Sequence, residues 1–356
     1  MKDSPNLDLL RAIAVLLVVA DHIGIVADPS RMLLWTTLGT AGVSIFFVHT
    51  CLVLMMSMER NRAPVLSFYV RRVFRIYPLA VAMVLLTAVM VVVSGKSMDA
   101  GIFWSNVFLV QNLTGHPSAV GQMWSLPYEV QMYLVLPLLF VLVKWRGVRS
   151  VAALMAASVA LILALALSGR GYSLLEFLPS FLAGVLAFAL GKRARHSPVL
   201  LFTVAAGVIA AAYLGVAASR SALVGTVLFW ILCLAIGVTI PYCREFTYPP
   251  LARAAALVAK YSYSIYLTHF LAMDAGFKLA ADLPPLLQWT ICFALMAAWA
   301  RVGYRWIEEP GIAWGKRVSD RFQVQTNTCG RAVAAPPGPA TPSASSEIGD
   351  GAVKSW

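Results

Sequence analysis

Apolar stretches of about twenty residues recur along the whole chain and constrain its fold more than any other feature. Ten of them can be read, at 7–27, 33–58, 78–94, 123–143, 150–168, 172–190, 198–217, 222–241, 257–280 and 286–306. Each is close to the roughly 20 residues that a helix needs to cross the hydrocarbon core of a bilayer. Only 12% of the residues are charged and 60% are hydrophobic, whereas a soluble domain averages about 25% charged residues. The sequence therefore predicts an all-α integral membrane protein, a bundle of about ten transmembrane helices.

Basic residues are distributed unevenly between the loops that join these stretches. With the N-terminus placed in the cytoplasm, 23 of the 28 Lys and Arg residues fall on the inner side and 5 on the outer side. This is the asymmetry that positive-inside insertion requires. It predicts that both termini are cytoplasmic and that the lipid bilayer is the main partner. It also accounts for the net charge of +12 without nucleic acid as a partner.

The sequence predicts one membrane domain, at 1–321, followed by a disordered cytoplasmic tail at 322–356 that is rich in Ala, Pro, Ser and Gly. The 101–112 segment is too short to span and is expected to form an interfacial or re-entrant helix. The first stretch contains Arg11 and has no small-residue cleavage site, so we do not expect it to be removed as a signal peptide. The 5 cysteines lack metal-ligand or redox spacing, which predicts reduced structural thiols and no bound metal.

Arg11 and His22 lie inside the first apolar stretch, where charged and polar side chains are costly. Eleven residues of helix turn through about 1100°, which leaves an offset of about 20° and a rise of about 16 Å. The two side chains are therefore predicted to share one face, directed at other protein. Asp8, one turn before Arg11, is a candidate ion-pair partner. A neutral imidazole at His22 could act as a general base, or it could be a hydrogen-bonded packing residue.

Glu129 follows Trp124 and Pro127 at the start of the fourth apolar stretch. By helix rise it lies about 9 Å below the outer end of its span, and His22 lies about 8 Å below the outer end of the first. This predicts that the two reach a similar depth, where Glu129 could orient the imidazole or the substrate. The alternative is a carboxylate that is favoured by the dipole at a helix start.

Arg71, Arg72 and Arg75 precede Tyr77 and Pro78 at the inner end of the third stretch. Spacings of three and four residues let these arginines grip one polyanion together, which suits the nucleotide of coenzyme A. The alternative is a basic inner loop that serves only as a topology signal. His269 and Tyr266 lie in the ninth stretch, where they could line a pocket or pack.

Five of these runs together resemble the membrane acyltransferase-3 family of bacterial O-acyltransferases, in the family's order, over about residues 6–315. They are Arg11 followed by His22 with ten residues between, Arg72-x-x-Arg75-Ile76-Tyr77-Pro78, Trp124-Ser125-Leu126-x-x-Glu129-x-x-x-Tyr133-x-x-x-Pro137, Tyr263-Ser264-Ile265-Tyr266-Leu267-x-His269, and Ile307-Glu308-Glu309-Pro310. The chain departs from the family's usual pattern at Thr50-Cys51, where a Ser-Gly pair is common, at Val130, where a second acid is common, and at Gln122. These departures suggest a divergent acceptor pocket.

The resemblance implies an enzyme of the bacterial cytoplasmic membrane that moves an acyl group, most often acetyl, from cytoplasmic acyl-CoA to a carbohydrate hydroxyl of a cell-envelope or exported glycan. On the matching positions, Arg11 and His22 would be the essential pair, and Arg72 and Arg75 would belong to the donor side. The complete predicted site assigns catalysis to His22, Arg11 and Glu129, donor binding to Arg71, Arg72, Arg75 and Tyr77, and other pocket positions to Asp8, Trp124, Tyr266 and His269.

Two other classes of protein remain compatible with intramembrane Arg, His and Glu. A secondary transporter for a charged metabolite also carries such residues along its substrate path, although no internal repeat is visible here. A membrane sensor or scaffold without catalytic activity is the third interpretation.

Overall fold

The computed structural model describes residues 4–61, 64–191 and 222–334, and helices are the only regular secondary structure in these segments, as the sequence predicts. The α-helices are α1 (Pro5–Ala27), α2 (Met32–Asn61), α3 (Val65–Val93), α4 (Ala100–Val107), α5 (Gln111–Thr114), α6 (Leu126–Arg146), α7 (Val148–Leu167), α8 (Leu178–Leu190), α10 (Ala222–Thr239), α11 (Pro249–Met273), α12 (Pro285–Gly303) and α13 (Glu309–Ala334). A 3₁₀ helix, η2 (Gly121–Ser125), leads into α6, and π-helical segments follow α11 (η4, Asp274–Leu279) and α12 (η5, Tyr304–Glu308).

Seven helices in the described segments are long and apolar enough to cross a membrane, so the predicted count of about ten spans is not confirmed. The predicted stretch 198–217 lies outside the described residues. The apolar helix α8 has only 13 residues, because Pro179 stands in its first turn. α11 has 25 residues but is not among the seven. The 101–112 segment does form helices too short to span, of 8 and 4 residues.

Two predicted boundaries differ from the structure. α3 begins at Val65 rather than at residue 78, because the run of arginines lowers the hydropathy without interrupting the helix. The predicted disordered tail does not begin at residue 322, because α13 continues to Ala334. Residues 335–356 lie outside the described part of the chain.

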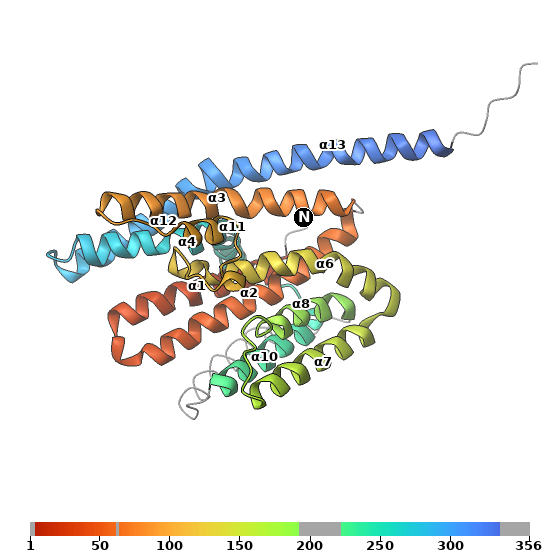
Figure 1. The fold of residues 1–356 in the computed structure, drawn as a ribbon, viewed down its shortest axis with the longest axis horizontal. Helices are drawn as coiled ribbons and strands as arrows, with labels where there is room; N and C mark the ends of the chain where they lie inside the picture. The colour runs from red at the N-terminus through yellow and green to blue at the C-terminus, as the bar shows by residue number, and fades with distance from the viewer. Residues whose placement is uncertain (1–3, 62–63, 192–221, 335–356) are drawn as a thin grey trace, which may run out of the picture.

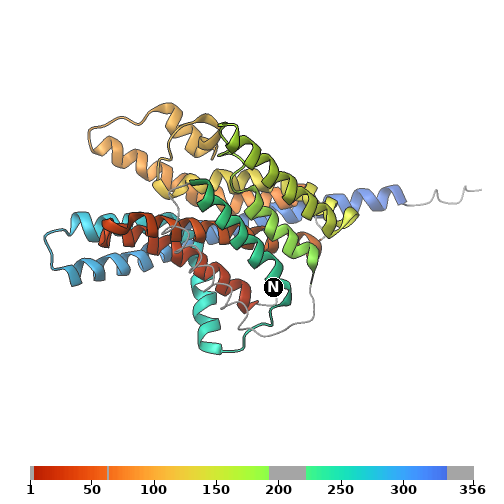
Figure 2. The same ribbon diagram turned by 90° about the horizontal axis from the view of Figure 1, so that it is seen from below.

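The helices form three groups that lie side by side (Figures 1 and 2). α7, α8 and α10 pack together on one side, where α8 and α10 also contact α2. α3 and α13 run alongside each other on the opposite side, and α12 packs against α11. α1 lies in the middle and packs against both α2 and α11, so the polar side chains of α1 face protein.

The contact between α3 and α13 depends on small residues. A Cβ at Gly311 would lie 2.6 Å from the carbonyl oxygen of Phe74, and one at Gly315 would lie 2.7 Å from the Cβ of Phe74. One turn further on, Ser67 donates a hydrogen bond to the carbonyl of Ser319. Since lipid tails are as apolar as leucine, helices in bilayers associate through close backbone approach of this kind. The two helices are therefore fixed against each other.

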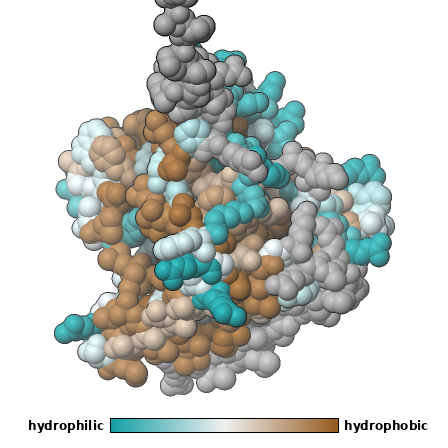
Figure 3. Space-filling view, turned by 90° about the vertical axis from the view of Figure 1, so that its right-hand side faces the viewer, coloured by the Kyte–Doolittle hydropathy of each residue, from teal (hydrophilic) through white to brown (hydrophobic). Residues whose placement is uncertain are grey.

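One end of the bundle carries charged residues from two helices. Glu59, Arg60, Lys144 and Arg146 gather where α2 and α6 end, and this is termed the basic end. Seen from this end, hydrophilic residues cross the middle of the face between apolar areas (Figure 3). α1 and α3 end at the opposite end, which is termed the far end.

Candidate active site

Arg11 and His22 both contact α11, as their spacing on one face of α1 predicts. Arg11 donates a hydrogen bond from Nε to the hydroxyl of Ser262 at 2.6 Å, and its guanidinium carbon lies 5.4 Å from the centre of the Phe46 ring. Nearer the far end, Nδ1 of His22 lies 3.1 Å from Nε2 of His269. The facing sides of α1 and α11 therefore hold Arg11 and His22 at two different levels along the bundle.

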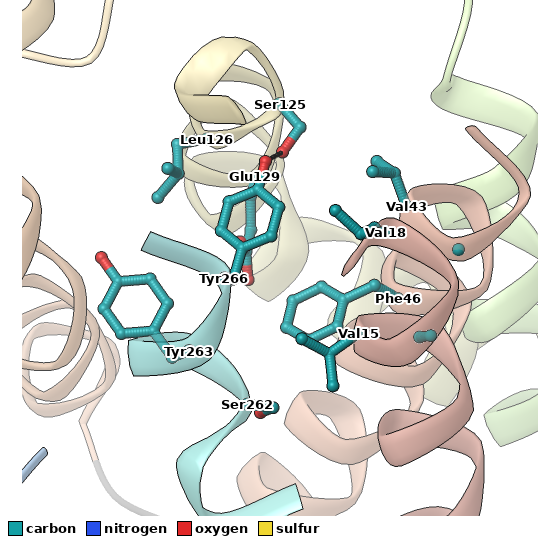
Figure 4. A pocket seen from close by; sticks show the side chains of 12 residues that line it. Val15, Val18, Val43, Phe46, Ser125, Leu126, Glu129, Ser262, Tyr263 and Tyr266 are labelled. Atoms are coloured by element: carbon teal, nitrogen blue, oxygen red, sulfur yellow. Dashed lines mark hydrogen bonds between the residues drawn. The ribbon is translucent and has the colours of Figure 1, made fainter. Parts of the chain in front are cut away.

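A cavity lies between these two levels, and it is termed the central cavity (Figure 4). It is a small cavity, with a volume of about 30 Å³. Tyr266 crosses it from α11 toward the start of α6, where its hydroxyl donates to the carbonyl of Gln122 and lies 2.7 Å from the Ser125 hydroxyl. Its lining is mostly apolar and consists of Ala14, Val15, Val18, Gly42, Val43, Phe46, Ser125, Leu126, Glu129, Ser262, Tyr263 and Tyr266.

A second cavity on the basic side is termed the arginine cavity. Its polar lining consists of Arg11, His49, Thr50, Arg72, Arg75, Glu129, Tyr133 and Tyr263. It shares Phe46, Glu129 and Tyr263 with the central cavity, so the two cavities adjoin. Four predicted site residues from three different helices, Arg11, Arg72, Arg75 and Glu129, thus meet there, although more than sixty positions separate Arg11 from Arg75 in the sequence.

The charges around the arginine cavity do not balance. Arg75 pairs with Glu308 at 2.9 Å, and Glu308, whose side chain is fully buried, also accepts a hydrogen bond from Ser264 at 2.8 Å. Glu129 accepts from the Tyr133 hydroxyl. Three guanidinium groups therefore face two carboxylates, and an unmatched buried charge is costly. The excess positive charge is chemically suited to an anion.

Two polar atoms at the arginine cavity are buried and have no hydrogen-bond partner within the described part of the chain. They are Nε of Arg72 and Nδ1 of His49. Most buried polar atoms in proteins have such a partner, so an unpaired one at a cavity wall indicates a site for a bound group. His49 was missed by sequence reasoning; the available signal was its position three residues after Phe46, on the same face of α2.

Glu129 lines the central cavity but is not among the described contacts of His22. Those contacts are with Val18, Asp21, His269 and Phe270. His269, and not Glu129, is thus the side chain that lies against the imidazole. The alternative, in which Glu129 orients the substrate, stays a prediction.

Four other predicted residues lie outside both cavities. Tyr77 donates a hydrogen bond to the carbonyl of Phe108 at 3.1 Å, and the Trp124 ring packs 5.5 Å from the Phe177 ring. The backbone of Arg71 faces Gly315 of α13. Asp8 lines neither cavity, and Nε of Arg11 donates to Ser262. Tyr266 lines the central cavity, and His269 lies at its far end beside His22.

Comparison with known proteins places this helical bundle with its buried Arg and His among the acyltransferases. The family model of the acyltransferase domain Acyl_transf_3 matches residues 4–305. The chain therefore belongs to the acyltransferase-3 family, as its motifs predict, and membership does not favour the transporter or scaffold alternatives.

Curated relatives match parts of the chain. It is 33% identical over 160 residues to the acyltransferase MdmB of Streptomyces mycarofaciens, an overlap of 41% of each protein. It is 30% identical over 162 residues to the peptidoglycan O-acetyltransferase OatA of Listeria monocytogenes, covering 40% of this chain and 25% of that protein. A putative peptidoglycan O-acetyltransferase of Bacillus subtilis, YrhL, is 32% identical over 157 residues, 38% of this chain and 24% of its own length. No solved structure shows a significant match to the chain.

Proposed function

We propose that this protein is a membrane O-acyltransferase that moves an acyl group, most simply acetyl, from acyl-CoA to a hydroxyl of a carbohydrate. The observation that carries the proposal is the adjoining pair of cavities, which joins a site with three arginines to a pair of histidines, the half-buried His22 and the buried His269. Membership of the acyltransferase family and the similarity to proteins named O-acetyltransferases support it.

In this proposal the donor enters from the basic end, which faces the cytoplasm. Its phosphates pair with Arg11, Arg72 and Arg75, because guanidinium groups bind phosphate through several charge-assisted hydrogen bonds at once. The pantetheine arm follows the path of the central cavity, whose mostly apolar lining suits a long neutral chain. The helices that line this small cavity have to move apart to admit the arm. The thioester then reaches the level of His22.

The acceptor enters from the far end, along a groove between the end of α3, the loop before α6 and the end of α11. This groove is lined by Met83, Thr87, Met90, Val91, Ser94, Lys96, Ala119, Val120, Gly121, Phe270, Leu271 and Asp274. The Phe270 ring, at its inner end, lies 4.5 Å from the His22 ring. Hydroxyl, carboxylate and ammonium groups beside an aromatic ring suit a sugar.

His22 acts as the general base for the transfer. It takes the proton of the acceptor hydroxyl as that oxygen attacks the thioester carbonyl carbon. The carbon–sulfur bond breaks, and the leaving thiolate receives the proton from the imidazolium, so the products are the ester and free coenzyme A. General-base assistance of this kind is worth about 10²- to 10⁴-fold.

The direct test compares cells that carry the wild-type protein with cells that carry His22→Ala at the same membrane level. Mass spectrometry of the envelope and exported glycans identifies the acyl group that requires the wild-type chain. We expect its loss by at least about 100-fold in the variant. Acylation that persists at the wild-type level in His22→Ala would remove the base from the proposal. Uptake of a charged metabolite into proteoliposomes that contain the protein, with no acyl transfer, would favour a transporter.

A further inference from the structure

Two histidines from different helices, His22 of α1 and His269 of α11, form a hydrogen-bonded pair at the far end of the central cavity. Their ring centres lie 5.0 Å apart, and His269 is fully buried. Hydrogen positions on such rings follow from the groups around each nitrogen. Here those groups determine which nitrogen carries hydrogen in each of the two rings.

The Nδ1 atom of His269 faces two carbonyl oxygens, those of Tyr266 at 2.8 Å and Ile265 at 3.1 Å. Carbonyl oxygens only accept, so this nitrogen must carry hydrogen and donate. A buried imidazolium with no carboxylate among its described contacts would be costly, so His269 is neutral. Its Nε2 therefore has a free lone pair and accepts.

The same reasoning applies to His22. Its Nδ1 atom lies 2.9 Å from the Val18 carbonyl oxygen and 3.1 Å from Nε2 of His269. Both neighbours are acceptors, so Nδ1 of His22 carries the hydrogen. The neutral imidazole then has its lone pair on Nε2, which is the atom that can remove a proton.

Asp21 lies near that free nitrogen. Its Oδ2 atom is 3.8 Å from Nε2 of His22, and its Oδ1 atom is buried without a partner among the described residues. The carboxylate fits there because residue 39 is glycine: a Cβ at Gly39 would lie 2.0 Å from Oδ2. Once Nε2 has taken a proton, this carboxylate faces the new positive charge.

We propose that His269 is a positioning residue that accepts the Nδ1 hydrogen of His22, fixes the tautomer with Nε2 as the basic atom, and aims that atom between the acceptor and Asp21. The proposal rests on the proposed function in taking His22 as the base, but it predicts a state of the resting protein that can be measured without any substrate. Val18 orients the ring from its own helix, and His269 adds the restraint from the opposite wall.

The first test is nitrogen NMR of the purified protein labelled at its histidine rings, with His22→Ala and His269→Gln used for assignment. Chemical shifts distinguish protonated from unprotonated ring nitrogens. We expect hydrogen on Nδ1 and none on Nε2 in both His22 and His269. Hydrogen on Nε2 of His22 in the neutral ring would overturn the proposal, whatever the activity.

The second test is kinetic and compares three variants. His269→Leu removes the acceptor, and we expect kcat to fall roughly tenfold with the KM for the donor unchanged, the value of about one hydrogen bond. His269→Gln carries an oxygen near the position of Nε2 and should restore most of kcat. Thr268→Val is the control, because the Thr268 hydroxyl bonds only within its own helix, to the Ser264 carbonyl.

The outcomes separate the two proposals. Loss of activity in His22→Ala together with wild-type kcat in His269→Leu would overturn the role of His269 alone. Equal loss in His269→Gln and His269→Leu, at equal melting temperature in detergent, would overturn it as well. Full activity in His22→Ala would contradict the proposed function, while the NMR result would still decide the tautomer.

Discussion

The arginine cavity and the histidine pair are both polar sites inside an apolar bundle, but they are stabilised in opposite ways. At the arginine cavity the groups are charged, the charges are unequal, and Arg72 and His49 each keep an unpaired atom. At the histidine pair three of the four ring nitrogens are within hydrogen-bond distance of a partner. The first site lacks a negative charge that the proposed donor would supply, whereas the second is already ordered and leaves one basic atom free.

This difference separates binding from chemistry. A ligand that supplies the missing negative charge gains affinity from groups that are costly while unpaired. A base has to keep one orientation and a neutral lone pair before the substrate arrives. Substitutions at the first site should therefore change donor affinity and stability, and substitutions at the second should change turnover.

The largest expected effect is on stability, at the pair of Arg75 and Glu308. Arg75→Met leaves the fully buried carboxylate of Glu308 without its cation, and we expect the free energy of unfolding in detergent to fall by about 3–5 kcal/mol. The double variant Arg75→Met/Glu308→Met removes both charges and should recover most of this loss.

Arg305→Met is the matched control, because its pair with Glu309 is on the surface, with the two side chains 72% and 40% exposed. We expect a loss below about 1 kcal/mol there. Equal losses in Arg75→Met and Arg305→Met would contradict the distinction between the buried and the surface pair.

The next effect is on donor affinity, and it sharpens the contrast between the two sites. Arg72→Ala removes a guanidinium that lines the arginine cavity, and we expect acyl-CoA to bind about ten- to hundredfold more weakly, the value of a hydrogen bond to a charged group. Titration calorimetry on the purified protein measures this. His22→Ala should bind the donor as wild type does. If both variants lose affinity to the same degree, the separation of binding from chemistry fails.

The smallest expected effect concerns His49. His49→Leu removes a buried nitrogen that has no partner in the described structure, so stability should not fall. Donor binding should weaken by about two- to tenfold, because the bound anion loses one hydrogen bond. His116→Leu, in the loop between α5 and η2, is the control. An unchanged donor affinity in His49→Leu would exclude His49 from the anion site.

Much of the fold could be predicted because hydropathy and helix length are both local properties. The apolar stretches within the described residues form helices, and the spacing of Arg11 and His22 predicts their common neighbour α11. Hydropathy reports compatibility with lipid, however, and not the bounds of a helix, so α3 is longer than predicted. For a related reason α11, although it has 25 residues, is not apolar enough to count as a typical span. Its polar residues Ser262, Tyr266 and His269 face the site instead of lipid.

The partners within the site could not be predicted, because they depend on how helices are set against each other. Glu308 stands next to Glu309 in the chain, yet one is buried against Arg75 and the other lies on the surface with Arg305. His49 stands three residues after Phe46, but the sequence does not show that the arginines of α1 and α3 lie across from that face of α2.

The tight seam of α3 against α13 has a mechanical consequence. Arg72 and Arg75 lie on α3, whose backbone closely approaches that of α13 at Gly311. The α3 wall of the arginine cavity is therefore held rigidly by α13. The arginine cavity can therefore widen only if the helices that form its other walls move, and these are α1, α2, α6 and α11. Entry of the proposed donor therefore requires displacement of some of these four helices, and one of them, α1, carries both Arg11 and His22.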